Sequence, residues 1–175
     1  MYPEEYIDYL VHFHGDRDYF ECHEILEDYW KTVDKNNKNS ILVAFILLAV
    51  SNYHHRRGNF RGASRTLKKA VTIFNKQKPL LNNFGFSPQQ FIDYLNNHLK
   101  YVEDGKEYRS IKLPIHDTAL IESCILACNE KGFIWGQESD LSNEEIVHRH
   151  VKRDRSDVLN ERNLALTLRH KKGRE

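Results

Sequence analysis

The longest apolar run in the chain is Ile41-Leu42-Val43-Ala44-Phe45-Ile46-Leu47-Leu48-Ala49-Val50. Every position in it is apolar, so a helix made from it is apolar on all sides and needs other elements around it. The run is about half of the ~20 residues that a bilayer span requires. We therefore expect the central helix of a globular domain and not a membrane anchor, with Ser40 as its N-cap and Gly58 as its end.

Amphipathic segments flank this central helix on both sides. Residues 18–33 and residues 59–74 each place apolar side chains at i, i+3, i+4 and i+7, which is typical of helices with one buried face. Asp18 with Glu21, Asn59, and Ser87 with Pro88 are the expected N-terminal signals. Further helices are expected over residues 3–14, 88–104 and 117–131, and residues 108–115 should be extended before Pro114.

These segments leave no room for a sheet, because no alternating strand pattern of useful length occurs. The sequence predicts an all-α fold of antiparallel helical hairpins packed as a compact array. A further capping box at residues 142–145 predicts a long, charged C-terminal helix. We accordingly expect a helical domain over residues 1–140 and a charged helical extension over residues 141–175.

Composition narrows the class of protein. With 175 residues, 40% apolar and 29% charged, the chain suits one soluble domain with an appendage. Its first residues, Met1-Tyr2-Pro3-Glu4-Glu5, lack the basic and apolar regions of a signal peptide, so a cytoplasmic location is expected. Three cysteines without a C-x-x-C motif, Cys22, Cys124 and Cys128, support neither a disulfide framework nor a cysteine zinc site.

Charge is distributed unevenly along the chain. Residues 1–38 hold ten acids and four bases, and residues 148–175 hold nine bases and four acids. Such asymmetry predicts docking of the two ends, within one chain or across a homo-oligomer. It also allows a nucleic-acid partner for residues 148–175, although these lack interleaved aromatic residues.

The motif His23-Glu24-Ile25-Leu26-Glu27 is the first candidate for chemistry. His23 and Glu27 are four residues apart and share one helix face, in a pattern H-E-x-x-E that echoes the zinc-binding H-E-x-x-H. A divalent metal there needs a further ligand, and His54 or His55 is the natural source; the sequence leaves that choice open. In an enzyme built this way, His23, Glu27 and His54 are the candidate ligands, and Glu24 or Glu27 the candidate base.

A second interpretation of the same residues involves no metal. Glu27 then accepts hydrogen bonds from Arg57 or Tyr53 and His23 stacks on Trp30, which locks two helices together. Both interpretations predict a groove between the second and third helices, lined by His23, Glu27, Tyr53, His54, Arg57 and Asn59. Asn59 is itself best explained as an N-cap.

No Gly-rich phosphate loop, G-x-S-x-G motif or activated cysteine is found, and no cofactor is established by the sequence. The function that we favour is a non-enzymatic binding or interaction module for a protein or small-molecule partner, with no membrane partner. The alternatives are the metal-dependent enzyme and nucleic-acid binding through the basic C-terminal segment.

The motifs taken together resemble a known family. Tyr19-Phe20-Glu21-Cys22-His23-Glu24-Ile25-Leu26-Glu27, followed by Trp30, His54, Gly58-Asn59 and Gly62-Ala63, is similar to the bacterial and archaeal helical family called domain of unknown function family 309, of the YpuF-like kind. The resemblance covers about residues 13–75, and the segment after Ser142 also looks YpuF-like. It implies an all-α fold and a cytoplasmic bacterial protein, and it implies no activity.

Overall fold

The computed structural model describes residues 1–152 of the chain. These residues form α-helices and one 3-10 helix: α1 (Glu4–His14), α2 (Tyr19–Val33), α3 (Ile41–Arg56), α4 (Phe60–Lys76), η1 (Lys78–Phe84), α5 (Pro88–Glu103), α6 (Thr118–Glu130), α7 (Glu144–Val147) and α8 (Arg149–Lys152). Within that range there is no strand, only an isolated bridge between Phe86 and Ile115. The predicted all-α class is confirmed.

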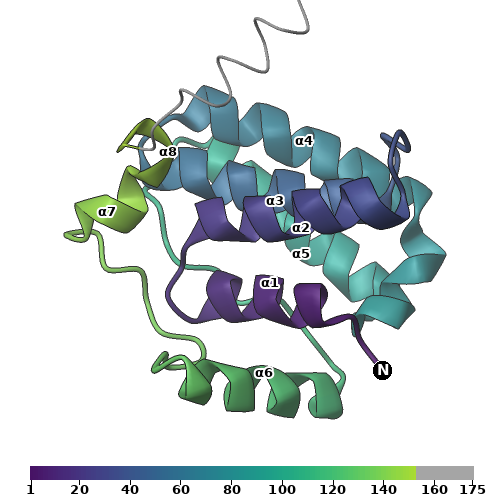
Figure 1. The fold of residues 1–175 in the computed structure, drawn as a ribbon. Coiled ribbons are helices and arrows are strands. Elements are labelled where there is room, and N and C mark those ends of the chain that lie inside the picture. Colours follow the sequence, from purple (N-terminus) through teal and green to yellow (C-terminus); the bar gives the residue numbers. More distant parts are fainter. Residues whose placement is uncertain (153–175) are drawn as a thin grey trace, which may run out of the picture.

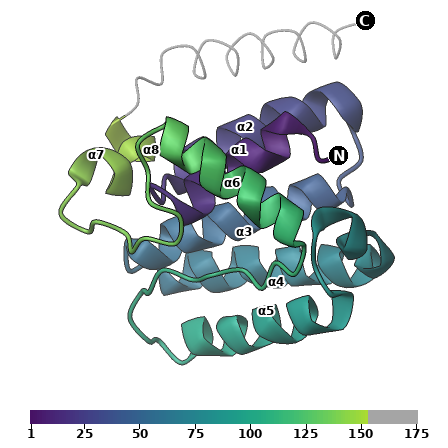
Figure 2. The same ribbon diagram turned by 90° about the horizontal axis from the view of Figure 1, so that it is seen from below.

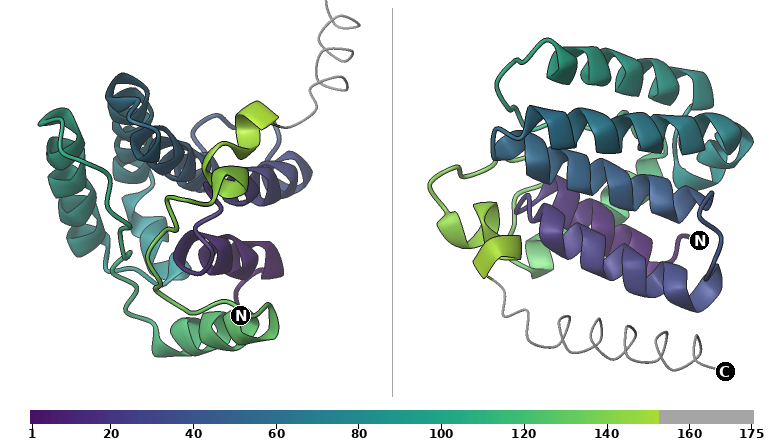
Figure 3. Two further views of the ribbon diagram at one scale, coloured as in Figure 1. Left: turned by 90° about the vertical axis from the view of Figure 1, so that its left-hand side faces the viewer. Right: turned by 90° about the horizontal axis from the view of Figure 1, so that it is seen from above.

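Helices α1 to α5 run back and forth, each packed against the next, and α6 returns to cover α1 (Figures 1 and 2). Figure 3 shows α3 between α2 and α4, which is the central position that its sequence predicts. Among residues 1–152, no helix is both long and apolar enough to cross a bilayer.

The apolar run in α3 forms the centre of the core. Ala44, Phe45, Leu48 and Ala49 have no exposed surface. The Phe45 ring contacts rings from α1, α4, η1 and α5, and its carbonyl accepts a hydrogen bond of 2.9 Å from the Tyr9 hydroxyl. One stripe of α3, formed by Val43, Leu47 and Val50, is only partly buried. That stripe lies at i, i+4 and i+7 and is the open side of the helix.

Side-chain caps explain where most helices begin. Asp18, Ser40, Asn59 and Asp117 each accept a hydrogen bond from a backbone N–H in the first turn that follows, as the sequence predicts. Pro3 proves to be the N-cap of α1 instead of its first residue. Ser87 makes no side-chain cap, so that part of the expected signal is wrong, although α5 does begin at Pro88.

The C-terminal segment differs from the long helix predicted from Ser142. Ser142 bonds to Asp140, and Asn143 is the N-cap of α7. In residues 141–152 the chain forms two four-residue helices, α7 and α8, with a break at His148. The Ile146 carbonyl, which a continuous helix would use for the N–H of residue 150, accepts instead from the Arg56 guanidinium. The rest of the predicted helix, residues 153–175, lies outside the described residues.

Helix α2 buries a narrower stripe than its sequence predicts. Cys22 and Leu26 are fully buried, but Val33 is exposed and Trp30 is only partly buried. The Trp30 indole N–H donates to the Asn37 carbonyl in the loop before α3. Trp30 therefore packs at the edge of the core and not inside it.

Candidate functional site

A groove of about 420 Å³ lies between the N-terminal half of α2, the C-terminal half of α3 and α8. Five of the six predicted groove residues line it, namely His23, Tyr53, His54, Arg57 and Asn59. The remaining lining residues are Tyr19, Phe20, Val50, His150 and Val151. The structure thus brings most of the predicted residues together, and adds aromatic walls and a third side.

Glu27, the sixth predicted residue, is not on the groove wall. Its carboxylate binds the Nε2 of His23 at 2.8 Å and the Nζ of Lys31 at 2.9 Å. The expected hydrogen bonds from Arg57 or Tyr53 to Glu27 are therefore wrong. The Glu27 carboxylate instead pairs with residues four positions before and after it on the same helix. The centre of the His23 ring lies 6.1 Å from the centre of the Phe20 ring. His23 thus has Phe20 and not Trp30 as its aromatic neighbour, so the expected stacking on Trp30 is also wrong.

Glu24, the other candidate base, is part of the same cluster. Its carboxylate lies 3.0 Å from the Nδ1 of His23, and about two thirds of its side chain is buried, the exposed fraction being 32%. One ligand atom each from His23, Glu24 and Glu27 lie within 4.8 Å of one another. The predicted metal ligands were His23, Glu27 and His54. In the structure Glu24 takes the place of His54, whose Nδ1 faces the amide nitrogen of Asn59.

His54 is held by the turn between α3 and α4. The Oδ1 of Asn59 caps α4 by accepting from the Gly62 N–H at 2.9 Å, which leaves the Asn59 amide nitrogen facing the Nδ1 of His54 at 3.2 Å. A Cβ on Gly62 would meet that amide nitrogen at 2.6 Å. The three atoms nearest to that position all belong to Asn59. Glycine is needed here to seat the capping side chain.

The open choice between His54 and His55 is settled by burial. His55 is 1% exposed and faces the opposite side, where its Nε2 lies 2.8 Å from the Lys106 carbonyl. His54 lines the groove. Its pKa is lowered by burial, and the nearby Arg57, Arg65 and His150 lower it further.

Arg57 sits at the exposed mouth of the groove. Its guanidinium lies over the Tyr53 ring, 5.3 Å from the centroid, and Nη1 is 3.5 Å from the Tyr53 hydroxyl. Among residues 1–152 it pairs with no carboxylate. The guanidinium is thus oriented by an aromatic face while its charge is not neutralised by an acid of the described chain.

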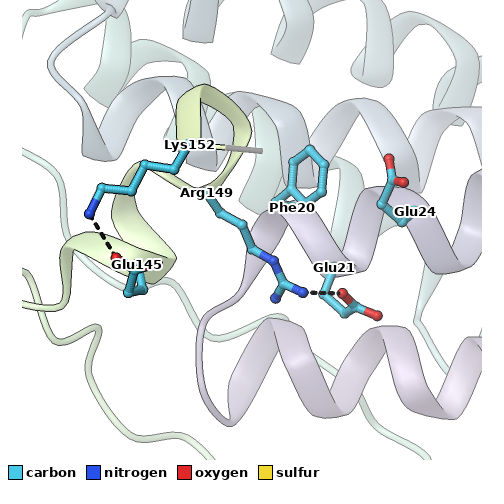
Figure 4. Close-up of a pocket in the computed structure, with 6 residues that line it drawn as sticks. All are labelled: Phe20, Glu21, Glu24, Glu145, Arg149 and Lys152. Carbon is cyan, nitrogen blue, oxygen red and sulfur yellow. Dashed lines mark hydrogen bonds and ion pairs between the residues drawn. The ribbon is translucent and has the colours of Figure 1, made fainter. Parts of the chain in front are cut away.

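The third wall, α8, is attached to α2 by charge. Arg149 pairs with the buried N-cap carboxylate of Asp18. It also pairs with Glu21 at 3.0 Å, and Figure 4 shows both residues at the border of a second hollow of about 440 Å³, where Lys152 pairs with Glu145. Docking of His150 and Val151 against Phe20 and Tyr53 was not predicted from the sequence, and the only signal for it was the opposite charge of the two chain ends.

The nucleic-acid segment proposed from the sequence falls largely outside the described residues. Within residues 148–152, both Arg149 and Lys152 pair with acids of their own chain.

Comparisons with known proteins agree with the motif resemblance. No solved structure matches the chain. The family described as "Domain of unknown function (DUF309)" matches residues 6–66, which include α1, α2, α3 and the start of α4. The Bacillus subtilis (strain 168) protein named "Uncharacterized protein YpuF" is 42% identical over 171 residues, which are 98% of each chain. The chain therefore belongs to the family of domain of unknown function DUF309.

Proposed function

We propose that this protein is a non-enzymatic binding module, and that the groove between α2, α3 and α8 receives its ligand. The groove has the usual form of a ligand site, with apolar and aromatic walls and a few polar groups at one end. Phe20, Val50 and Val151 supply apolar surface, while His54 and Arg57 supply hydrogen-bond donors. We further propose that the module acts in the cytoplasm.

The observation that carries this proposal is the convergence of three separate elements on one hollow. Val50 belongs to the partly buried stripe of α3 and lines the groove. The central helix therefore has apolar surface in the groove that no core residue covers completely. A volume of about 420 Å³ is within the range of sites for small organic molecules and for one or two side chains of a protein partner.

A groove-filling substitution tests the proposal. Val50→Phe places a ring in the groove, and Val43→Phe is the matched control, because Val43 lies two turns earlier on the same partly buried stripe and does not line the groove. Small-molecule fragments screened by amide NMR should shift the signals of Gly58 and Asn59 in the wild type and in Val43→Phe, and not in Val50→Phe. Fragments that shift no groove signal, or that bind Val50→Phe unchanged, would refute the proposal.

A divalent metal at His23, Glu24 and Glu27 is the second candidate function. It is supported by the proximity of three ligand atoms on one helix. One observation argues against a metal there. Each nitrogen of the His23 ring already contacts a carboxylate, so neither nitrogen is open to a metal ion unless that contact is broken. Zinc titration followed by calorimetry decides this: stoichiometric binding that is lost in Glu27→Gln would favour the metal.

A further inference from the structure

The groove carries the positive charge of Arg57, and this sets the chemistry of what it can hold. Its lining includes Arg57 and three histidines, and no aspartate or glutamate lines it within residues 1–152. Arg65 adds to the positive potential, since it is one of the charges that lower the pKa of His54. Glu24 and Glu27 pair with His23, and Asp18 and Glu21 pair with Arg149.

His54 contributes a hydrogen-bond donor whose position follows from a chain of contacts. The Gly62 N–H requires the oxygen of the Asn59 amide, so the Asn59 nitrogen must face His54. An amide nitrogen only donates, so the Nδ1 of His54 accepts. The proton of a neutral His54 ring is then on Nε2, which becomes the donor that His54 offers. The lowered pKa of His54 agrees with a neutral ring at pH 7.

Arg57 contributes the charge and a planar set of donors. Its guanidinium lies over the Tyr53 ring, and among residues 1–152 none of its N–H groups donates to an acid. A planar guanidinium fits the two oxygens of a carboxylate or phosphate.

We propose that the groove recognises an oxyanion carried on a flat apolar body, with Arg57 and the Nε2–H of His54 holding the oxyanion and Phe20, Tyr53 and Val151 enclosing the body. This inference rests on the proposed function, since it names the ligand class of the same groove. Aromatic walls favour a planar body, because Phe20 and Tyr53 both present rings to the hollow.

The probes are 2-naphthoate, 2-naphthyl phosphate and the uncharged 2-naphthamide, with inorganic phosphate as a head group without a body. Binding to the full chain is measured by amide NMR titration at pH 7.5, with Arg57→Gln and the matched control Arg61→Gln. Arg61 is an exposed arginine one position into α4 and does not line the groove. His54→Phe keeps a ring in place and removes the donor.

We expect the two naphthyl anions to shift the Gly58 and Asn59 amides and to bind about tenfold more tightly than 2-naphthamide. Arg57→Gln should remove that preference and Arg61→Gln should keep it, while His54→Phe weakens both anions. The tighter binder of 2-naphthoate and 2-naphthyl phosphate identifies the preferred head group. Weak binding of inorganic phosphate alone would show that the apolar body is required.

Two results would overturn the inference. If 2-naphthamide binds in the groove as tightly as the anions, the oxyanion preference is wrong and the binding module stands. If none of the probes shifts a groove amide while uncharged fragments do, the ligand class is again wrong. If no compound of either kind binds there, the proposed function fails as well.

Discussion

Asn59 connects helix capping to the groove. One end of its amide caps α4 and the other end orients His54, so a residue that the sequence identifies only as an N-cap also sets the hydrogen bonding of a groove histidine. The cap was predictable from the glycine stop and the apolar period that follows. The bond to His54 was not, since it depends on the path of the turn through Gly58, whose φ is +72°.

Substitution of Asn59 separates these two roles. Asn59→Asp keeps an oxygen for the Gly62 N–H but cannot donate to His54, so the Nδ1 of His54 should become protonated and its pKa should rise. Asn59→Ala loses the cap as well and should cost about 1 kcal/mol of stability. Imidazole ¹⁵N NMR over pH 5 to 8 reports the His54 tautomer and pKa. An unchanged His54 pattern in Asn59→Asp would show that the bond to Asn59 does not orient the ring.

His98 makes stability depend on pH. Burial lowers the pKa of His98 from 6.5 to about 4, with smaller contributions from His55 and Arg109. Among residues 1–152 neither ring nitrogen has a protein partner. The unfolded chain therefore takes up a proton below pH 6.5 that the folded ring resists, so the stability from His98 is present above pH 6.5 and is lost as the pH falls toward 4.

The size of this loss is roughly 3 kcal/mol at pH 4 relative to pH 7.5. His98→Leu removes the titrating group, so the difference in unfolding free energy between wild type and variant should change by that amount across the range. Urea unfolding at several pH values measures it. A constant difference from pH 7.5 to pH 4 would mean that His98 is accessible to protons in the folded state.

Helix α2 shows where helical periodicity is informative and where it is not. The spacing of Cys22, Leu26 and Trp30 identifies the face that packs on α3. It does not show how far the neighbouring helices extend, and α2 ends with Trp30 and Val33 at the margin of the core. Burial along one stripe of a helix thus depends on the lengths of its partners.

Two aromatic truncations test this difference. The sequence alone predicts that Trp30→Ala costs ~3 to 5 kcal/mol, as for a buried aromatic residue. Since Trp30 is partly exposed, we expect about 2 kcal/mol or less, and the full ~3 to 5 kcal/mol for Phe45→Ala, whose ring is fully buried. Chemical denaturation of both variants measures the costs. Equal losses would place Trp30 inside the core after all.

Arg56 ties the C-terminal helices to the core. Arg56 is 8% exposed, and its guanidinium lies over Tyr19 and donates to the Arg17 carbonyl, the Ser139 hydroxyl and the Ile146 carbonyl. Its position in the last turn of α3 indicates only a cation at a helix C-terminus. Its partners are more than 80 residues away in two of three cases, which no local pattern reveals.

Arg56→Met should release this attachment. We expect a loss on the order of 3 kcal/mol, from buried hydrogen bonds to a charged group. Amide hydrogen exchange should rise in residues 139–152 and stay low in α1 and α3. Arg57→Met is the control, since Arg57 is exposed and its contacts are with Tyr53 of α3. Slow exchange throughout residues 139–152 in Arg56→Met would show that α7 and α8 are held by other contacts.

At the level of the whole molecule, the array of helices α1 to α6 was predictable and the closure of the groove was not. Caps and periodicity are local, so they locate the helices and the central role of α3. The third wall of the groove comes from α8, more than 90 residues after Tyr53 in the sequence. The charge difference between the chain ends predicted some association, and Arg149 with Asp18 and Glu21 is one such contact within the chain.

Helices α2, α3 and α8 together form the proposed ligand site, with the charge of Arg57 at its mouth. A crystal structure of the full chain grown with 2-naphthoate shows whether this site binds the proposed ligand class. We predict the naphthyl ring between Phe20, Tyr53 and Val151, and the carboxylate within hydrogen-bond distance of Arg57 and the Nε2 of His54. A ligand bound on another surface, or a groove filled by the protein's own side chains in the presence of saturating ligand, would contradict the account.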